Sequence, residues 1–236
     1  MKNANHDYPL LAALAAGCLL LQVSCSPAVV VAVRPDSSGT ASVSTDMSPT
    51  AENLVRRFSS GDGDSTSGMY DREQISVALA QAGFRVDTLT FPTRTAFALG
   101  VSFANLKGFP ANSVSVQSSP RSVRATLSRE SLAAAVGLMP AGTRDYLDLL
   151  MAPVFTGESM TSSEYEEIIG AAYGKTLAAE LKRSVFTLTI RCPAAVVSAR
   201  SDGSAQPVVN GNSAIFTLPL STLLTLEEPV TLRASW

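Results

Sequence analysis

The sequence predicts an α+β fold, in which a mainly antiparallel β-sheet carries helices packed on one face and is interrupted by a helical insertion. The clearest strand spans 95–103, where large apolar residues alternate with small ones, as expected of a half-buried antiparallel strand. These apolar residues are Phe97, Leu99, Val101 and Phe103. Apolar residues then recur at helical spacing between 129 and 183, and strict alternation returns from residue 185. This order of periods predicts a helical block inserted between sheet-forming segments.

The segments before residue 95 predict a hairpin, two helices and a strand. Asp36-Ser37-Ser38-Gly39 has the composition of the hairpin turn. Ser48-Pro49 suits the N-cap and first position of a helix, and a later helix has apolar residues at helical spacing. The predicted elements are strands at 28–34 and 40–45, helices at 50–58 and 71–82, and a strand at 86–91.

The segments after residue 103 predict a hairpin around Ser119-Pro120, four helices and a second group of strands. Thr161 and Glu164 have the spacing of a capping box at the start of the third helix. Asn210-Gly211 predicts a turn before a strand. The predicted elements are strands at 112–117 and 122–128, helices at 129–136, 143–151, 161–173 and 175–183, and strands at 185–191, 194–199, 214–218 and 230–236.

These elements divide the chain into three parts. Residues 1–24 are a predicted export signal, and residues 25–128 together with 184–236 form the sheet domain. Residues 129–183 form the helical insertion.

Composition and charge exclude several classes of function. The net charge is −2, and it stays −2 after removal of residues 1–24, which contain one lysine (Lys2) and one aspartate (Asp7). The sequence has nothing that resembles the basic stripe that phosphate backbones require, so we expect no nucleic-acid partner. The single histidine, His6, lies in the export signal. The mature chain thus lacks the imidazole that Ser-His-Asp and Cys-His catalysis and most zinc and haem sites require, so we predict no catalytic residues and no cofactor.

The first 24 residues have the pattern of an export signal. The apolar run from Leu10 to Leu21 has 12 residues, too few to span a membrane but suited to the h-region of a signal peptide. The run ends in Leu21-Gln22-Val23-Ser24-Cys25, which resembles the lipobox of bacterial lipoproteins. In that family the cysteine thiol receives a diacylglycerol and the freed amine is acylated. The resemblance implies lipidation at Cys25 and a membrane anchor.

The lipobox departs from the common pattern at Gln22, where most lipoboxes have leucine. Spirochaete lipoproteins are known for such loose boxes. Cys18 follows a locally better match, but cleavage there leaves three leucines beyond the anchor, so Cys18 is the alternative site. In that alternative, a Cys25–Cys192 disulfide becomes possible. Otherwise Cys192 is the one remaining mature cysteine, and we expect it to be a small buried hydrophobe.

The loop at 62–73 has acidic and hydroxyl residues at the spacing of an EF-hand calcium loop. Asp62, Asp64 and Thr66 take positions 1, 3 and 5, and Glu73 takes position 12. Position 6, which requires glycine for the sharp turn, is Ser67. The alternative interpretation is a solvated surface loop.

The segment at 149–155 is unusually apolar for the end of a helix broken by proline. It predicts either a lid over a hydrophobic pocket or membrane-facing edge, or a helix and turn packed onto the sheet. The residues predicted to contact a lipid are Leu149, Leu150, Met151, Val154 and Phe155.

Two further patterns resemble a known family. The turn Arg34-Pro35-Asp36-Ser37-Ser38-Gly39-Thr40 follows an N-terminal strand, and the tail combines Asn210-Gly211-Asn212, Pro219-Leu220 and a last strand. Together they resemble the LppM-type lipoproteins of bacterial envelopes, a domain of unknown function, over 28–128 and 184–236. The resemblance implies an α+β cup that holds a lipid. The helical block at 129–183 departs from the compact pattern of that family.

These patterns predict a non-catalytic lipoprotein of the cell envelope, anchored to the inner or outer membrane and facing the periplasm or the exterior. Its expected partners are the membrane and a lipid or other hydrophobic ligand. A mean hydropathy of +0.19 agrees with an apolar site, although a well-filled core explains it equally. The alternative is a structural lipoprotein that binds other envelope proteins and no small molecule. An enzyme that uses carboxylates or lysine is a third hypothesis.

Overall fold

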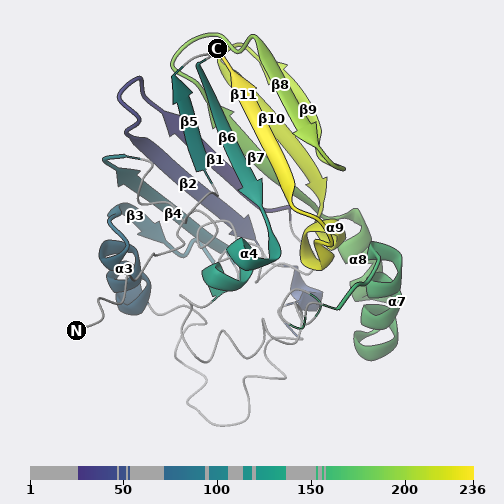
Figure 1. Cartoon of the computed structure of the whole chain (residues 1–236). Coiled ribbons are helices and arrows are strands. Elements are labelled where there is room, and N and C mark those ends of the chain that lie inside the picture. The colour runs from purple at the N-terminus through teal and green to yellow at the C-terminus, as the bar shows by residue number, and fades with distance from the viewer. Residues whose placement is uncertain are drawn as a thin grey trace, which may run out of the picture.

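The protein is described by a computed structural model (Figure 1). The structure describes residues 26–46, 48–51, 72–93, 96–105, 114–118, 121–136 and 158–236, together with positions 53, 153 and 156.

Most of the strands belong to a seven-stranded sheet with the order β3-β4-β2-β1-β7-β10-β9. All neighbours are antiparallel except β1 and β7, which run parallel. This parallel pair joins β1, the first described strand, to β7, which follows the helical insertion. The strands are β1 (Ala28–Val33), β2 (Gly39–Asp46), β3 (Arg85–Thr90), β4 (Ala96–Phe103), β7 (Val185–Arg191), β9 (Gln206–Asn210) and β10 (Ser213–Pro219).

A second, four-stranded antiparallel sheet has the order β5-β6-β11-β8 and covers part of the larger one (Figure 1). Its outer face is turned toward the viewer in Figure 1. The strands are β5 (Val114–Ser118), β6 (Arg121–Leu127), β8 (Ser198–Asp202) and β11 (Val230–Ser235). The predicted α+β class with a mainly antiparallel sheet is confirmed, but the strands form two sheets where the sequence predicted one.

The core lies between the two sheets. Alternate residues of β1, β7 and β10 face inward and are almost fully covered, as are those of β6 and β11. Phe186 and Phe216 are the largest of the fully buried side chains. Because both sheets contribute to one continuous cluster, each holds the other in place. Each fully buried large apolar side chain stabilises the fold by roughly 1.5–3 kcal/mol.

The described helices gather at one end of the sandwich and beside β3 (Figure 1). A short helix between β10 and β11 contacts two helices of the insertion, at 162–173 and 175–183, and the strands β7 and β10. It buries Leu220, Leu223 and Leu224 almost completely, so the C-terminal segment attaches the insertion to the sandwich. The helices are α3 (Arg72–Gln81), α4 (Arg129–Val136), α7 (Ser162–Tyr173), α8 (Lys175–Arg183) and α9 (Leu220–Thr225).

The turn between β1 and β2 is ordered by its own side chains. Asp36 Oδ1 accepts hydrogen bonds from the backbone amide and the hydroxyl of Ser38, at 3.0 and 2.7 Å. These bonds hold the pKa of the Asp36 carboxyl below its usual value. Ser37 takes the left-handed backbone conformation, with φ of 67°. Gly39 is required for a different reason: a Cβ there would lie 2.1 Å from the Ala32 carbonyl oxygen.

Most predicted elements match the structure within two residues, and the capping box at Thr161 and Glu164 is confirmed. The strand predicted at 194–199 is wrong, because residues 193–197 form an irregular link between the sheets and β8 starts only at Ser198. The sequence did not predict β9 or α9. The predicted helix at 143–151 and most of the one at 50–58 lie outside the described residues, although positions 49–51 and 53 are helical.

Candidate functional site

Most of the residues that the sequence predicted to be functional lie outside the described part of the chain. Glu73 is the exception, and it is exposed in the first turn of α3. The calcium and lipid-contact predictions therefore stay predictions. The residues outside the described part are Cys18, Cys25, Asp62, Asp64, Thr66, Leu149, Leu150, Met151, Val154 and Phe155.

Cys192 is a buried free thiol at the end of β7. Its exposed fraction is 3%, which confirms the prediction of a small buried hydrophobe. Burial raises the pKa of the thiol to about 11. At neutral pH the thiol is therefore protonated and a poor nucleophile.

The alternative Cys25–Cys192 disulfide does not fit the register of β1 and β7. The amide of Thr187 donates to the carbonyl oxygen of Pro27 at 2.9 Å, so the chain just before β1 lies at the start of β7. Cys192 lies beyond the other end of β7, about 20 Å from Phe186 at the usual rise per residue. Two residues back from Pro27 cover no more than about 8 Å, whereas a disulfide needs Cα atoms within about 7 Å.

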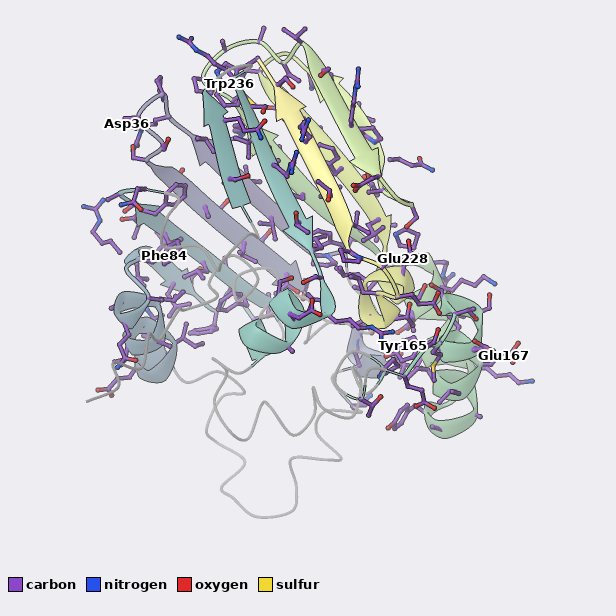
Figure 2. All side chains as sticks on the ribbon, in the orientation of Figure 1. Asp36, Phe84, Tyr165, Glu167, Glu228 and Trp236 are labelled. Carbon is purple, nitrogen blue, oxygen red and sulfur yellow. The ribbon has the colours of Figure 1, made fainter. Side chains whose placement is uncertain are left out.

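The beginning of β1 lies at the helical end of the sandwich. Ala28 pairs with Thr187, and Ser184, just before β7, accepts a hydrogen bond from the amide of Leu220 at the start of α9. The β1–β2 turn lies at the opposite end: Figure 2 shows Asp36 far from Tyr165, which lies among the helices. Only Ser26, which is exposed, separates Cys25 from Pro27, which is buried and bonded to the sheet.

A row of three arginines crosses the outer face of the smaller sheet. Arg124 of β6 is directly opposite Arg233 of β11, and Arg233 is directly opposite Arg200 of β8. We call these three residues the arginine row. Their neighbours along each strand point into the core, so the three side chains share the outer face. Strand spacing makes the row about 10 Å long.

Hydroxyl groups flank the arginine row on both sides. The adjacent row toward the free end of β11 contains Gln117, Ser122, Ser235 and Ser198. The row on the other side contains Thr126, Thr231 and Asp202. The described outer face is thus entirely polar. Ser122 is buried and donates to Gln117, and Ser198 donates to Ser235, which leaves the hydroxyls of Ser235, Thr126 and Thr231 as donors beside the row.

No carboxylate neutralises the arginine row within the described residues. Asp202 is the one acidic residue of that face, and its Oδ1 accepts a hydrogen bond from the amide of Thr231. None of the three arginines forms an ion pair or a hydrogen bond with the described chain. The Nε of Arg124 is buried and has no acceptor. A buried donor without a partner costs roughly 1–3 kcal/mol, so the row has unused capacity for an anion.

The arginine row was not predicted from the sequence. Each arginine occupies an outward position of its strand, which alternation alone indicates for Arg124 and Arg233. The register that brings them together joins segments far apart in the chain. The net charge of −2 does not reveal such a local cluster of positive charge.

A comparison of the chain with protein-family models, curated proteins and solved structures found no match. The resemblance to LppM-type lipoproteins therefore stays a prediction. Among the described residues, no helix has the length and apolar character of a membrane span. In the same part of the chain, no three histidine, cysteine or acidic side chains are grouped to hold a metal ion.

Proposed function

We propose that this chain is an exported, lipid-anchored protein of the cell envelope that acts by binding a lipid or another amphiphile, and not by catalysis. The leader and the cysteine at its end support export and anchoring. The confinement of histidine to the leader supports a binding function.

One observation carries this proposal: Pro27, only two residues after the proposed lipidation site Cys25, is already part of the folded sheet. Pro27 already bonds to Thr187, so acyl chains on Cys25 would hold the helical end of the sandwich within about 8 Å of the bilayer surface. A protein that exchanges an amphiphile with the membrane gains from this closeness.

The helical insertion supports the same orientation. The predicted lipid-contact segment belongs to the stretch between α4 and α7, of which only positions 153 and 156 are described before Glu158. The start of α4 and the end of this stretch lie together at the helical end, because the guanidinium of Arg129 donates to the carbonyl oxygen of Glu158 at 2.9 Å and to that of Leu226 at 3.0 Å. We therefore propose that residues 149–155 serve the membrane-facing end of the molecule.

A second candidate function is the docking of another envelope protein. The observation in its favour is three exposed valines near the β8–β9 edge of the sandwich, of which Val208 and Val209 lie on opposite faces of β9. Val197, Val208 and Val209 expose 82%, 58% and 46% of their surface. Pro207 in the edge strand limits pairing with a further strand, so such a partner would bind by side-chain contacts.

Metabolic labelling tests the anchor. Cells that express the protein would be grown with an alkyne analogue of palmitate, and the label would be compared between the native chain, Cys25→Ala and Cys18→Ala. We expect label on the native chain and on Cys18→Ala, and none on Cys25→Ala. Label that persists in Cys25→Ala, or an unlabelled native chain, contradicts the proposed anchor.

Native mass spectrometry tests the ligand. The anchored protein would be released from membranes in a mild detergent and its mass compared before and after organic extraction. We expect a co-purified lipid in addition to the covalent acyl chains, and less of it in Val154→Asp. A mass that accounts only for the acylated chain, together with no uptake of fatty-acid probes, favours the docking function.

A further inference from the structure

The arginine row on the outer face of the smaller sheet has no function in the lipid-binding proposal. We propose that Arg124, Arg233 and Arg200 form a binding site for a phosphate-bearing ligand, with pyrophosphate or a phosphomonoester as the recognised group. The site depends only on the row and its register, and it holds whether or not Cys25 is acylated.

The three arginines repel one another when no anion is bound. Like charges that face each other across neighbouring strands destabilise a sheet, and here two such pairs share one residue, Arg233. Asp202 offsets one charge of the three on this face, so the described face keeps an excess of positive charge. A bound anion would remove this repulsion.

The geometry of the guanidinium donors matches that of a phosphate group. Arginine presents its donors in a planar fork that pairs with two oxygens of a phosphate at once. Arginines on adjacent strands are about 5 Å apart, so a phosphate can bridge one pair and a pyrophosphate can extend toward the third. A single carboxylate has two oxygens and engages one fork, which leaves the other arginines without partners.

Two hydroxyl groups beside the row can donate further hydrogen bonds to a phosphate. The hydroxyls of Ser235 and Thr231 lie on the same strand as Arg233, one on either side of it on the outer face. Phosphate oxygens beyond those held by the guanidinium groups can accept from these hydroxyls.

The location of the row separates it from the membrane anchor. The row crosses β11 at Arg233, nearer to the C-terminal end of the strand than to α9, whereas β1 begins at the helical end. The site therefore opens on the side of the sandwich, where a free phosphate compound and the headgroup of a lipid monomer can both reach it.

Isothermal titration calorimetry tests the proposal with the full-length chain in a non-ionic detergent at about 50 mM salt. The probes are inorganic phosphate, inorganic pyrophosphate, dihexanoyl phosphatidic acid and dihexanoyl phosphatidylcholine. We expect pyrophosphate to bind more tightly than phosphate, because it spans more of the row. Phosphatidic acid that binds more tightly than pyrophosphate identifies a lipid headgroup as the ligand, and the reverse order identifies a soluble phosphate.

Three variants separate the site from general charge. Arg233→Gln is expected to weaken pyrophosphate binding at least tenfold, and Arg233→Lys, which keeps the charge but loses the fork, at least threefold. Arg191→Gln removes an exposed arginine from the outer face of the larger sheet and should leave binding unchanged. Circular dichroism and the urea midpoint confirm that each variant is folded.

The proposal is overturned if none of the phosphate probes produces a binding isotherm. It is equally overturned if Arg191→Gln and Arg233→Gln weaken binding to the same extent, because binding then reflects net charge alone. Neither result depends on the palmitate labelling, so failure of the anchor and failure of the arginine row are distinguishable.

Discussion

Arg129 and Leu226 are joined by a hydrogen bond of 3.0 Å, from the guanidinium Nε to the backbone carbonyl oxygen. Leu226 follows the last residue of α9 and has a positive φ of 23°, so its carbonyl belongs to the end of that helix. The same guanidinium donates to the carbonyl oxygens of Thr225 at 3.3 Å and Glu158 at 2.9 Å. One side chain thus joins the start of α4, the end of α9 and the segment before α7. A cation at this place also interacts favourably with the helix dipole.

Replacement of Arg129 by alanine is expected to lower the free energy of unfolding by about 2 kcal/mol, because it removes charge-assisted bonds to three carbonyl groups. Arg129→Lys should recover less than half of the loss, since an ammonium group cannot reproduce the fork. Urea unfolding followed by circular dichroism measures both. Arg191→Ala, at an exposed arginine, is the control and should stay within about 0.5 kcal/mol of the native chain. An Arg129→Ala chain as stable as that control contradicts the prediction.

Glu180 of α8 connects the helical insertion to the start of the helix at 49–51. Its carboxylate oxygens accept hydrogen bonds from the hydroxyls of Ser48 and Thr50, both at 2.9 Å. Ser48 also accepts from the amide of Ala51, which confirms the predicted N-cap.

Glu180→Ala is expected to reduce stability by about 2 kcal/mol, since two bonds to a charged acceptor are lost. Glu180→Gln should lose about half as much, because one oxygen remains an acceptor. Glu167→Ala, on the exposed side of α7 (Figure 2), is the matched control. Equal unfolding midpoints for Glu180→Ala and Glu167→Ala would show that the two hydroxyl bonds contribute nothing.

Gly39 lies where β2 passes close to both neighbouring strands. A Cβ at this position would lie 2.1 Å from the Ala32 carbonyl oxygen and 2.5 Å from Cζ of Phe103, which packs in the core. Gly39→Ala is therefore expected to cost about 2–3 kcal/mol in thermal or urea unfolding. Gly170→Ala is the comparison, because its Cβ would meet only the Ala178 methyl at 3.3 Å and alanine favours the helix. If Gly39→Ala is as stable as Gly170→Ala, the close approach of Ala32 and Phe103 does not restrict this position to glycine.

Cys192 provides a pH-dependent test of burial. Its pKa is about 11 in the folded chain against an ordinary value of 9.0, so the folded state keeps the thiol proton longer than the unfolded state does. The contribution to stability is full below about pH 9 and is lost as the pH rises toward 11. Native protein should thus resist a thiol reagent at pH 8 and react after unfolding in urea. Rapid labelling of Cys192 in the native protein at pH 8 would contradict this prediction. Cys192→Ala should show a smaller fall in stability between pH 9 and 11.

Repulsion within the arginine row predicts a stability effect that is separate from ligand binding. Arg233→Gln should raise the free energy of unfolding at about 10 mM salt by roughly 0.5–1 kcal/mol, because it removes the positive charge that lies between Arg124 and Arg200. At 0.5 M salt the difference should shrink, as screening removes the repulsion in the native chain. The measurement is urea unfolding at both salt concentrations. A destabilised Arg233→Gln at low salt would show that the row is not under repulsion.

Local patterns sufficed for the elements whose signals are complete within a short segment. The α7 helix carries its own capping box at Thr161 and Glu164, and β7 alternates buried Phe186, Leu188 and Ile190 with outward residues. In both cases the start, the period and the apolar face are encoded within about 12 residues, so no distant contact was needed.

The missed elements lack such local signals. In β9 every residue is exposed, since the strand lies at a sheet edge, so its apolar and polar residues do not alternate. In α9 five of the six residues are buried, so the helix has no polar face that sets a helical period. The segment at 193–197 contains a strand-like apolar run, but Val196 is buried and Val197 is exposed in a link that crosses between the sheets.

By itself, the sequence determined the α+β class and the inward face of most strands, because each depends on neighbours within one turn or one strand. The tertiary structure decided which strands pair, that they divide into two sheets, and that Arg124, Arg233 and Arg200 stand side by side. Alternation specifies which face a side chain takes but not its partner on the next strand. That partner is set by how the two apolar faces pack together, and this packing involves the whole chain.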